Sequence, residues 1–92
     1  MGEVSQELMR EKERQVEGLK NLFRKLFGEY FKKHHEYPPL YSGNIIEDTR
    51  RVNQFIGSRP EILRSIQNLP SVQSMVVEIA IDILKDLTDK TK

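Results

Sequence analysis

The sequence predicts a small all-α protein with four helices near 3–35, 45–56, 59–69 and 71–88. Two observations support this prediction. Apolar residues recur at spacings of three and four within each segment, and proline or glycine interrupts the pattern between segments. A chain of 92 residues has the size of a single domain with one modest core. We expect residues 1–18 to project from that core and residues 19–88 to form it.

The composition is typical of a folded helical protein, with 37% hydrophobic and 32% charged residues. Fifteen lysine and arginine residues nearly balance fourteen aspartate and glutamate residues, so the net charge of +1 favours no class of partner. The chain has no cysteine, which excludes disulfides, thiol nucleophiles and thiolate metal sites. No apolar run approaches the roughly 18 residues of a membrane span, and the N-terminus lacks an apolar signal region. We therefore expect a cytoplasmic protein.

The first predicted helix has two halves of different character. Residues 7–17 are mostly charged, with opposite charges three and four positions apart, whereas residues 19–31 are densely apolar and aromatic. A helix of about 30 residues is roughly 45 Å long. That length exceeds twice the radius of gyration of about 12 Å expected for this chain length. We expect the second half to pack on the core and the first half to overhang it. Tyr37-Pro38-Pro39 must end the helix, because proline cannot continue it.

The two middle helices are predicted from their ends. Asn44 is a typical N-cap for the second helix, and Gly57 ends it. Its predicted core face is Ile45, Thr49, Val52, Phe55 and Ile56. Ser58-Arg59-Pro60-Glu61 has the pattern of a capping box with an early proline, which starts the third helix. The predicted buried face of the third helix is Ile62, Leu63, Ile66 and Leu69.

The most apolar stretch runs from Val72 to Leu87 and predicts a central helix capped by Ser71. Its apolar stripe is Val72, Val76, Ile79, Ile83 and Leu87. A strand is the alternative, because residues 77–83 also alternate between β-branched and other residues. We prefer the helix, because the sequence offers no second strand for pairing. The side chains expected to be most sensitive to truncation are Phe23, Leu26, Ile79 and Ile83.

The sequence favours a non-enzymatic protein-interaction module, an adaptor or regulator that binds other protein chains through its helices and self-associates. The central helix has more apolar surface than three short neighbours easily cover, and uncovered apolar surface usually marks an interface. The overhanging part of the first helix adds apolar residues to a charged rod, in which Lys12 interrupts a regular coiled-coil stripe. The expected contact residues are Leu8, Met9, Arg10, Arg14, Val16, Ile81 and Leu84.

Nucleic-acid binding is the alternative function. Residues 49–68 have the layout of a helix-turn-helix with Gly57 in the turn. Two residues depart from that pattern: Asn53 stands where a small residue usually lets the two helices approach, and Ser58 follows the turn glycine. The groove-facing residues of this alternative would be Arg59, Arg64, Gln67 and Asn68, all of types that contact bases or phosphates.

The remaining motifs favour structural interpretations. Pro38-Pro39-Leu40-Tyr41 resembles the Pro-Pro-x-Tyr ligand of WW domains, and Tyr37–Leu40 resembles the Tyr-Pro-x-Leu signal of viral late domains, but we expect this loop to be pinned to the core. His34-His35 point in different directions on a helix and are poor joint metal ligands. The aromatic residues of 23–35 are interpreted as core and the cations as solvated, rather than as a membrane surface. No catalytic grouping occurs. We expect no enzymatic activity, cofactor, metal, small-molecule substrate or membrane partner.

Overall fold

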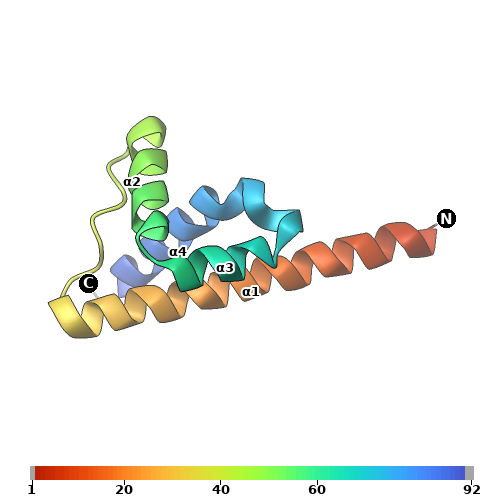
Figure 1. The fold of residues 1–92 in the computed structure, drawn as a ribbon, viewed down its shortest axis with the longest axis horizontal. Helices are drawn as coiled ribbons and strands as arrows, with labels where there is room; N and C mark the ends of the chain where they lie inside the picture. Colours follow the sequence, from red (N-terminus) through yellow and green to blue (C-terminus); the bar gives the residue numbers. More distant parts are fainter. Residues whose placement is uncertain (1, 91–92) are drawn as a thin grey trace.

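The computed structural model describes the backbone of residues 2–90 and the side chains of residues 9–90. The prediction of an all-α fold is confirmed. The helices are α1 (Gly2–His34), α2 (Ile45–Gly57), α3 (Pro60–Gln67) and α4 (Val76–Lys90), and a 3₁₀ helix, η1 (Pro70–Met75), precedes α4. No strand occurs among residues 2–90, so the strand alternative for the most apolar stretch is wrong. Figure 1 shows α1 as a rod on which the other elements are assembled toward its C-terminal end.

The length of α1 sets the shape of the molecule. Its 33 residues correspond to roughly 50 Å, and the molecule measures 49 × 27 × 25 Å. Packing of α1 against η1 and α4 begins at Gln15 and Val16, earlier than the expected boundary after Gly18. Residues 2–14 are called the projecting segment below, and residues 15–34 the packed segment. The projecting segment extends past the other helices at the N-terminal end of the rod (Figure 1).

Local chemistry explains why α1 ends where it does. Lys32, Lys33 and His34 occupy its last turn, where positive charge favourably meets the negative end of the helix dipole. His35 then adopts a left-handed conformation, with φ of 61°, and its amide donates to the carbonyl oxygen of Phe31 at 2.7 Å. Histidine is one of the non-glycine residues that tolerate this conformation better than most. The prolines that follow prevent any continuation of the helix.

Asn44 caps α2 as predicted. Its side-chain oxygen accepts hydrogen bonds from the amides of Ile46 at 3.0 Å and Glu47 at 3.1 Å. Val52 and Ile56 are buried as expected, but Ile45 is 67% exposed, so its assignment to the core was wrong. The reason is the orientation of α2, which rises away from α1 so that its first turn lies farthest from the rod (Figure 1). Among residues 9–90, no side chain covers Ile45 and Ile46 in that turn.

The predicted capping box at the start of α3 was wrong. Ser58 does not cap the helix; its hydroxyl donates instead to the carbonyl oxygen of Phe55 at 2.9 Å. Arg59 occupies the N-cap position without a side-chain capping bond, and Pro60, whose fixed φ suits a first helical residue, begins the helix. Ile62 and Ile66 are buried, whereas Leu63, expected on the same face, is exposed.

The central helix begins later than predicted. Residues 70–75 form η1, and α4 starts at Val76 rather than at Ser71. Ser71 does not cap a helix with its own side chain. Its amide donates to the side-chain oxygen of Gln15 on α1 at 2.9 Å, so a residue 56 positions away satisfies this group. Val72 is fully buried within η1, which explains its place in the apolar stripe.

The core lies between the packed segment of α1 and the other helices. Leu19, Phe23 and Phe27, spaced four apart, are fully buried, and the rings of Phe23 and Phe27 have centroids 5.5 Å apart. Ile79 and Ile83 contribute from α4, as predicted, whereas Leu26 is only half-buried at the edge. Packing of aromatic rings across helices continues from Phe27 to Phe55 of α2, at 5.8 Å.

Candidate protein-interaction surface

The contact residues predicted on α1 are exposed to different degrees. Met9 is 62% exposed, and Arg10 and Arg14 are exposed. Arg14 is bound to Glu11 by an ion pair of 3.1 Å, whereas Val16 is half-buried against the core. The side chain of Leu8 lies outside the described residues. Only Met9 therefore offers an exposed apolar contact among the described residues of this predicted set.

The two contact residues predicted on the central helix are not exposed. Ile81 is 8% exposed and Leu84 is 5% exposed, because α2, the loop before it and α1 cover α4 more completely than its apolar surface suggested. Both belong to the core cluster. The expectation that they form an uncovered surface was therefore wrong. They nevertheless form the floors of two open hollows, which are described below.

Gln15, a buried polar residue at the border of the two α1 segments, was not predicted from the sequence. It is 7% exposed. Its amide nitrogen donates to Glu11 Oε1 at 3.0 Å, and its oxygen accepts from the Ser71 amide. The sequence signal that could have indicated its burial is its position, one turn before Leu19 on the buried side of α1. The pairing with Ser71 depends on tertiary structure and has no local signature.

The residues of the nucleic-acid alternative are only partly available. Arg64, Gln67 and Asn68 are exposed, but Arg59 is half-buried at the corner between α2 and α3. Its guanidinium carbon lies 3.8 Å from the centre of the Phe55 ring, and its Nη1 donates to the Phe55 carbonyl oxygen at 3.0 Å. Arg59 thus stabilises the corner through a cation–π contact and a hydrogen bond. A contact between Arg59 and a DNA groove would have to compete with the cation–π contact and with the hydrogen bond.

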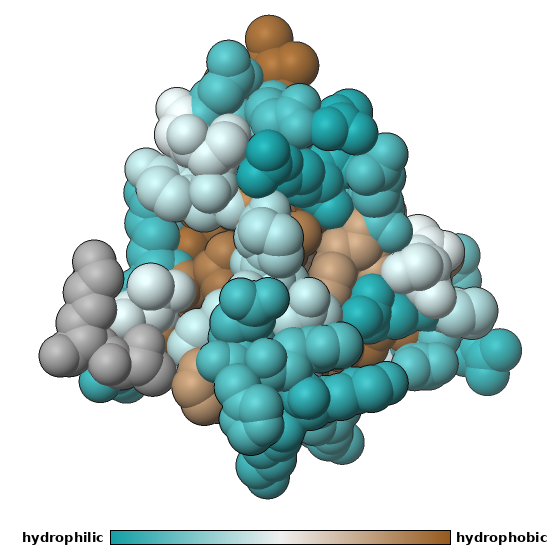
Figure 2. Space-filling model, turned by 90° about the vertical axis from the view of Figure 1, so that its left-hand side faces the viewer, coloured by the Kyte–Doolittle hydropathy of each residue, from teal (hydrophilic) through white to brown (hydrophobic). Residues whose placement is uncertain are grey.

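Three of the five large hydrophobic residues that are exposed among residues 9–90 lie where α2 begins. Tyr41 and Ile45 are exposed, and Ile46 is 79% exposed. We call these three side chains the apolar tip. Figure 2 shows hydrophobic surface at the top of the molecule and further hydrophobic surface in recesses between hydrophilic side chains below it. The apolar tip was not predicted, because the helical pattern assigned Ile45 to the core.

Hydrogen bonds hold the base of the apolar tip. Asp48 is buried, and its Oδ1 accepts from the amide of Ser42 at 2.7 Å and from the Ser42 hydroxyl at 2.6 Å. The Ser42 side-chain hydrogen bond, reinforced by the one from its amide, lowers the pKa of Asp48. Because Asp48 lies in the first turn of α2, this bonding fixes the direction in which the loop enters the helix.

A second set of charged contacts surrounds Glu47. Arg50 and Arg51 both donate to its carboxylate. Hydrogen bonds from Arg50 first, and Arg51 second, lower the pKa of Glu47 from 4.5 to about 2. Arg51 also donates to the carbonyl oxygen of Pro39 at 3.0 Å, which ties α2 to the preceding loop. The loop and the start of α2 therefore form one supported unit.

Two open hollows lie along α4 and share Tyr41 and Lys85. The first, of about 430 Å³, lies between α4 and the apolar tip, and the second, of about 610 Å³, lies between α4 and the loop before α2. Lys85 Nζ lies 4.4 Å from the centre of the Tyr41 ring, so this pair separates them. We call the two hollows together the α4 groove. Its residues on α4 are Val77, Glu78, Ile81, Asp82, Leu84, Lys85, Thr88 and Asp89.

The proline-containing loop is pinned to the molecule as expected. Pro38 and Leu40 are buried, and the Leu40 amide donates to the Pro38 carbonyl oxygen at 2.9 Å. A short peptide ligand for a WW domain needs an extended and accessible chain, which this turn does not offer. Pro39 and Tyr41 are the exposed residues of the motif, and Tyr41 forms part of the apolar tip.

The described residues offer no group of three or more histidine, cysteine, aspartate or glutamate side chains that could hold a metal ion. His34 instead packs on Tyr30, with ring centroids 4.3 Å apart. Within residues 2–90, no helix combines the length and the hydrophobicity needed to cross a lipid bilayer. Comparisons of the chain with protein-family models, curated proteins and solved structures found no match.

Proposed function

We propose that this protein is a non-enzymatic helical module that binds other protein chains as an adaptor or regulator, and that it self-associates. The apolar tip is the observation that supports the proposal. Three large hydrophobic side chains, Tyr41, Ile45 and Ile46, are exposed within positions 41–46 of a single segment. The segment is held by Asp48 and Arg51, so it presents these side chains on a fixed support. A preorganised apolar cluster loses little conformational entropy when a partner covers it.

The monomer leaves apolar surface exposed to water at the apolar tip. Burying an isoleucine side chain contributes about 1.5–3 kcal/mol, and the free chain forgoes most of this at both Ile45 and Ile46. Single exposed hydrophobic residues are ordinary on protein surfaces, but neighbouring ones beside a groove are typical of interfaces. A partner that covers the apolar tip would recover this contribution, and neighbouring charged residues would form a polar rim.

Self-association is supported by the projecting segment. Met9 of this segment and Val16, the second residue of the packed segment, line an open hollow bordered by Lys12, Glu13, Glu17 and Lys20. Charged residues on both sides of an apolar pair suit a second helix laid alongside the first. Because Lys12 interrupts the stripe, a short antiparallel contact is easier to build than a regular coiled coil.

Nucleic-acid binding is supported less well by the geometry. The corner between α2 and α3 exists, but Arg59 is engaged with Phe55, and α3 has only eight residues. A gel-shift series with mixed duplexes at low salt tests it directly, because phosphate contacts make binding strongly salt-dependent. A sequence-dependent shift would place this function above protein binding.

Affinity capture from the native cell tests protein binding, with Ile46→Asp compared against Leu63→Asp. Both positions are exposed apolar residues near a helix N-terminus, where an added carboxylate does not disturb the helix dipole. We expect Ile46→Asp to lose partners that Leu63→Asp and the unaltered chain retain. Identical sets of partners from all three would contradict the role of the apolar tip.

Sedimentation equilibrium tests self-association, with Met9→Glu compared against Lys25→Glu, an exposed position on the packed segment. We expect association of the unaltered chain at about 100 µM and its weakening by Met9→Glu, since mass action makes association concentration-dependent. A monomer at that concentration, with no difference between the chain and either variant, would contradict self-association.

A further inference from the structure

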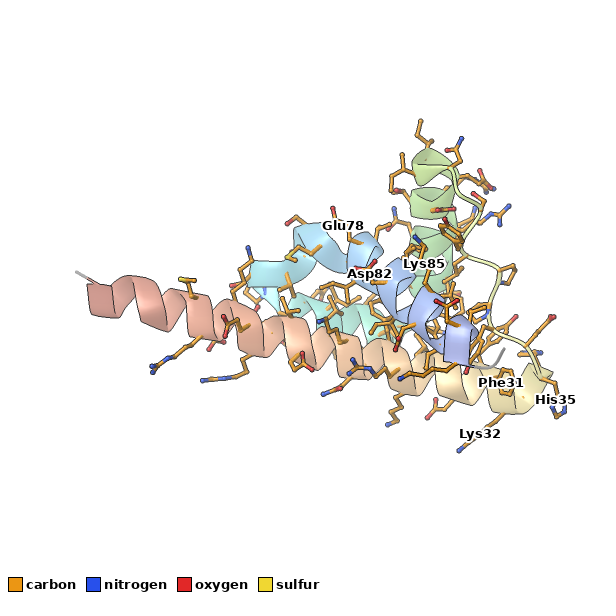
Figure 3. All side chains as sticks on the ribbon, turned by 180° about the vertical axis from the view of Figure 1, so that it is seen from behind. Phe31, Lys32, His35, Glu78, Asp82 and Lys85 are labelled. Carbon is orange, nitrogen blue, oxygen red and sulfur yellow. The ribbon has the colours of Figure 1, made fainter. Side chains whose placement is uncertain are left out.

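The α4 groove has two edges of different chemistry. On α4, Glu78, Asp82 and Lys85 lie along one exposed edge (Figure 3). Asp89 follows four positions after Lys85 and also lines the groove. Across the groove, the loop and the start of α2 provide Tyr37, Pro39, Tyr41 and Ile45. Val77, Ile81 and Leu84 line the groove between these edges. A partner would therefore meet carboxylates on one side and apolar side chains on the other and beneath it.

The carboxylates of Glu78 and Asp82 have no ion-pair partner among residues 9–90. Their cationic neighbour, Lys85, extends over the Tyr41 ring instead. The exposed cation Lys32 points away from α4 in Figure 3. Opposite charge beside an apolar surface guides the approach and orientation of a partner, so this edge favours a cationic one.

The backbone of the groove favours a helical occupant. Residues 77–89 span roughly 18 Å of α4. The amides and carbonyls of α4 are already bonded within the helix, so they cannot pair with an extended strand. A helix satisfies its own backbone and needs only side-chain contacts, which is the basis of helix-in-groove recognition.

A second copy of this chain fits the groove poorly. The projecting segment has four glutamates (Glu3, Glu7, Glu11 and Glu13) against three cations (Arg10, Lys12 and Arg14), a net charge of −1. It would therefore repel the acidic edge. The cationic residues 20–33 belong to the packed segment, whose apolar side chains Phe23 and Phe27 are buried in the core.

We propose that the α4 groove binds a cationic amphipathic helix of a different protein. Its aliphatic side chains pack on Val77, Ile81 and Leu84, and its lysine or arginine side chains face Glu78 and Asp82. This inference rests on the proposed function and adds the chemistry of the partner. It also separates two surfaces of the molecule, because self-association uses the projecting segment and the heterologous partner uses the α4 groove.

Two matched synthetic peptides of about 18 residues, long enough to form helix, test the inference. Both carry leucine at helical spacing; one has lysine and the other glutamate on the adjacent positions. Binding is measured by fluorescence anisotropy and mapped by amide chemical-shift changes in the full chain. We expect the lysine peptide to bind with a Kd below about 1 mM, at least about tenfold tighter than the glutamate peptide. The largest shifts should occur at Tyr41, Ile81 and Asp82.

Charge-reversal variants supply the controls. E78K/D82K should weaken binding of the lysine peptide at least about tenfold, whereas E61K, an exposed glutamate on α3, should leave it unchanged. Added salt should also weaken it, since these charges are exposed to solvent. Circular dichroism spectra identical to that of the unaltered chain would show that both variants remain folded.

The inference is overturned if the two peptides bind equally, if neither binds, or if the shifts lie on the projecting segment. It is also overturned if the protein alone shows concentration-dependent shifts in the α4 groove, because a second copy would then be the occupant. These outcomes are distinct from failure of the proposed function. Cellular partners that depend on Ile46 while neither peptide binds would leave protein binding supported and the partner chemistry wrong.

Discussion

The two segments of α1 belong to one continuous helix, yet their environments differ. In the packed segment, Leu19, Phe23 and Phe27 are fully buried. In the projecting segment, Met9 is exposed, and Arg14 and Glu11 pair with each other at the surface. Both segments have helical periodicity in the sequence. What distinguishes them is the presence of η1 and α4 beside only one of them.

This comparison shows that periodicity identifies a helical face but does not determine what covers it. Exposed pairs such as Arg14–Glu11 contribute little, on the order of 0.5 kcal/mol. Burial of aromatic side chains contributes several times more. The stability of the fold should therefore be concentrated after Gln15, while the projecting segment remains available for association.

Phe23→Ala should produce the largest effect. Removing this fully buried ring should lower the free energy of unfolding by about 3–5 kcal/mol, through lost burial and the cavity left behind. Met9→Ala in the projecting segment should change it by less than about 0.5 kcal/mol. Urea unfolding of the two variants measures both. Similar losses would mean that the projecting segment is covered in the monomer.

Gln15→Ala should lower the free energy of unfolding by less than Phe23→Ala, and it should also destabilise η1, because Gln15 bonds to Ser71. The Ser71 amide would lose its acceptor, at a cost of about 1–3 kcal/mol. Hydrogen exchange should accelerate at the Ser71 amide. Arg14→Ala, one position away but exposed, should leave the free energy of unfolding and the exchange rate at the Ser71 amide nearly unchanged. Equal exchange rates in the Gln15 variant and the unaltered chain would show that this bond does not hold η1.

Acid should reduce the stability supplied by the start of α2. The pKa values of Glu47 and Asp48 are lower in the folded chain, so the unfolded chain binds protons first as pH falls. Their contribution is complete above about pH 5 and is lost as pH falls from about 4.5 toward 2. Thermal melts between about pH 2 and 7 should show a shallower acid dependence for Glu47→Gln than for Glu11→Gln on α1.

Deletion of residues 1–9 should have the smallest effect on folding. It removes helix that lies before Gln15 and retains the Glu11–Gln15 hydrogen bond, so the melting temperature should change by only about 2 °C or less. Self-association should weaken in the same variant. A large fall in melting temperature of a monomeric sample would contradict the division of α1 into two segments.

Much of the fold follows from local sequence features. Pro38 and Pro39 stop α1, Asn44 caps α2, and Pro60 starts α3, because each acts through its own backbone or through amides a few residues away. The burial of Phe23 on α1 and of Ile79 and Ile83 on α4 was likewise predictable from the spacing of apolar residues. Ser58 and Ser71 show where local rules failed. Their sequence patterns resemble caps, but Ser58 bonds backward to Phe55, and the Ser71 amide bonds to α1.

The candidate site was less predictable than the fold. The sequence determined which residues are apolar, charged or helix-ending, since these depend on residue type and near neighbours. Tertiary structure decided that Ile45 is exposed, that Ile81 and Leu84 are buried, and that Gln15 meets Ser71. It also placed residues 41–45 across from residues 77–85 to form the α4 groove. The physical reason is that burial depends on which distant segments cover a face, and the angle of α2 against α1 and α4 sets that coverage (Figure 1).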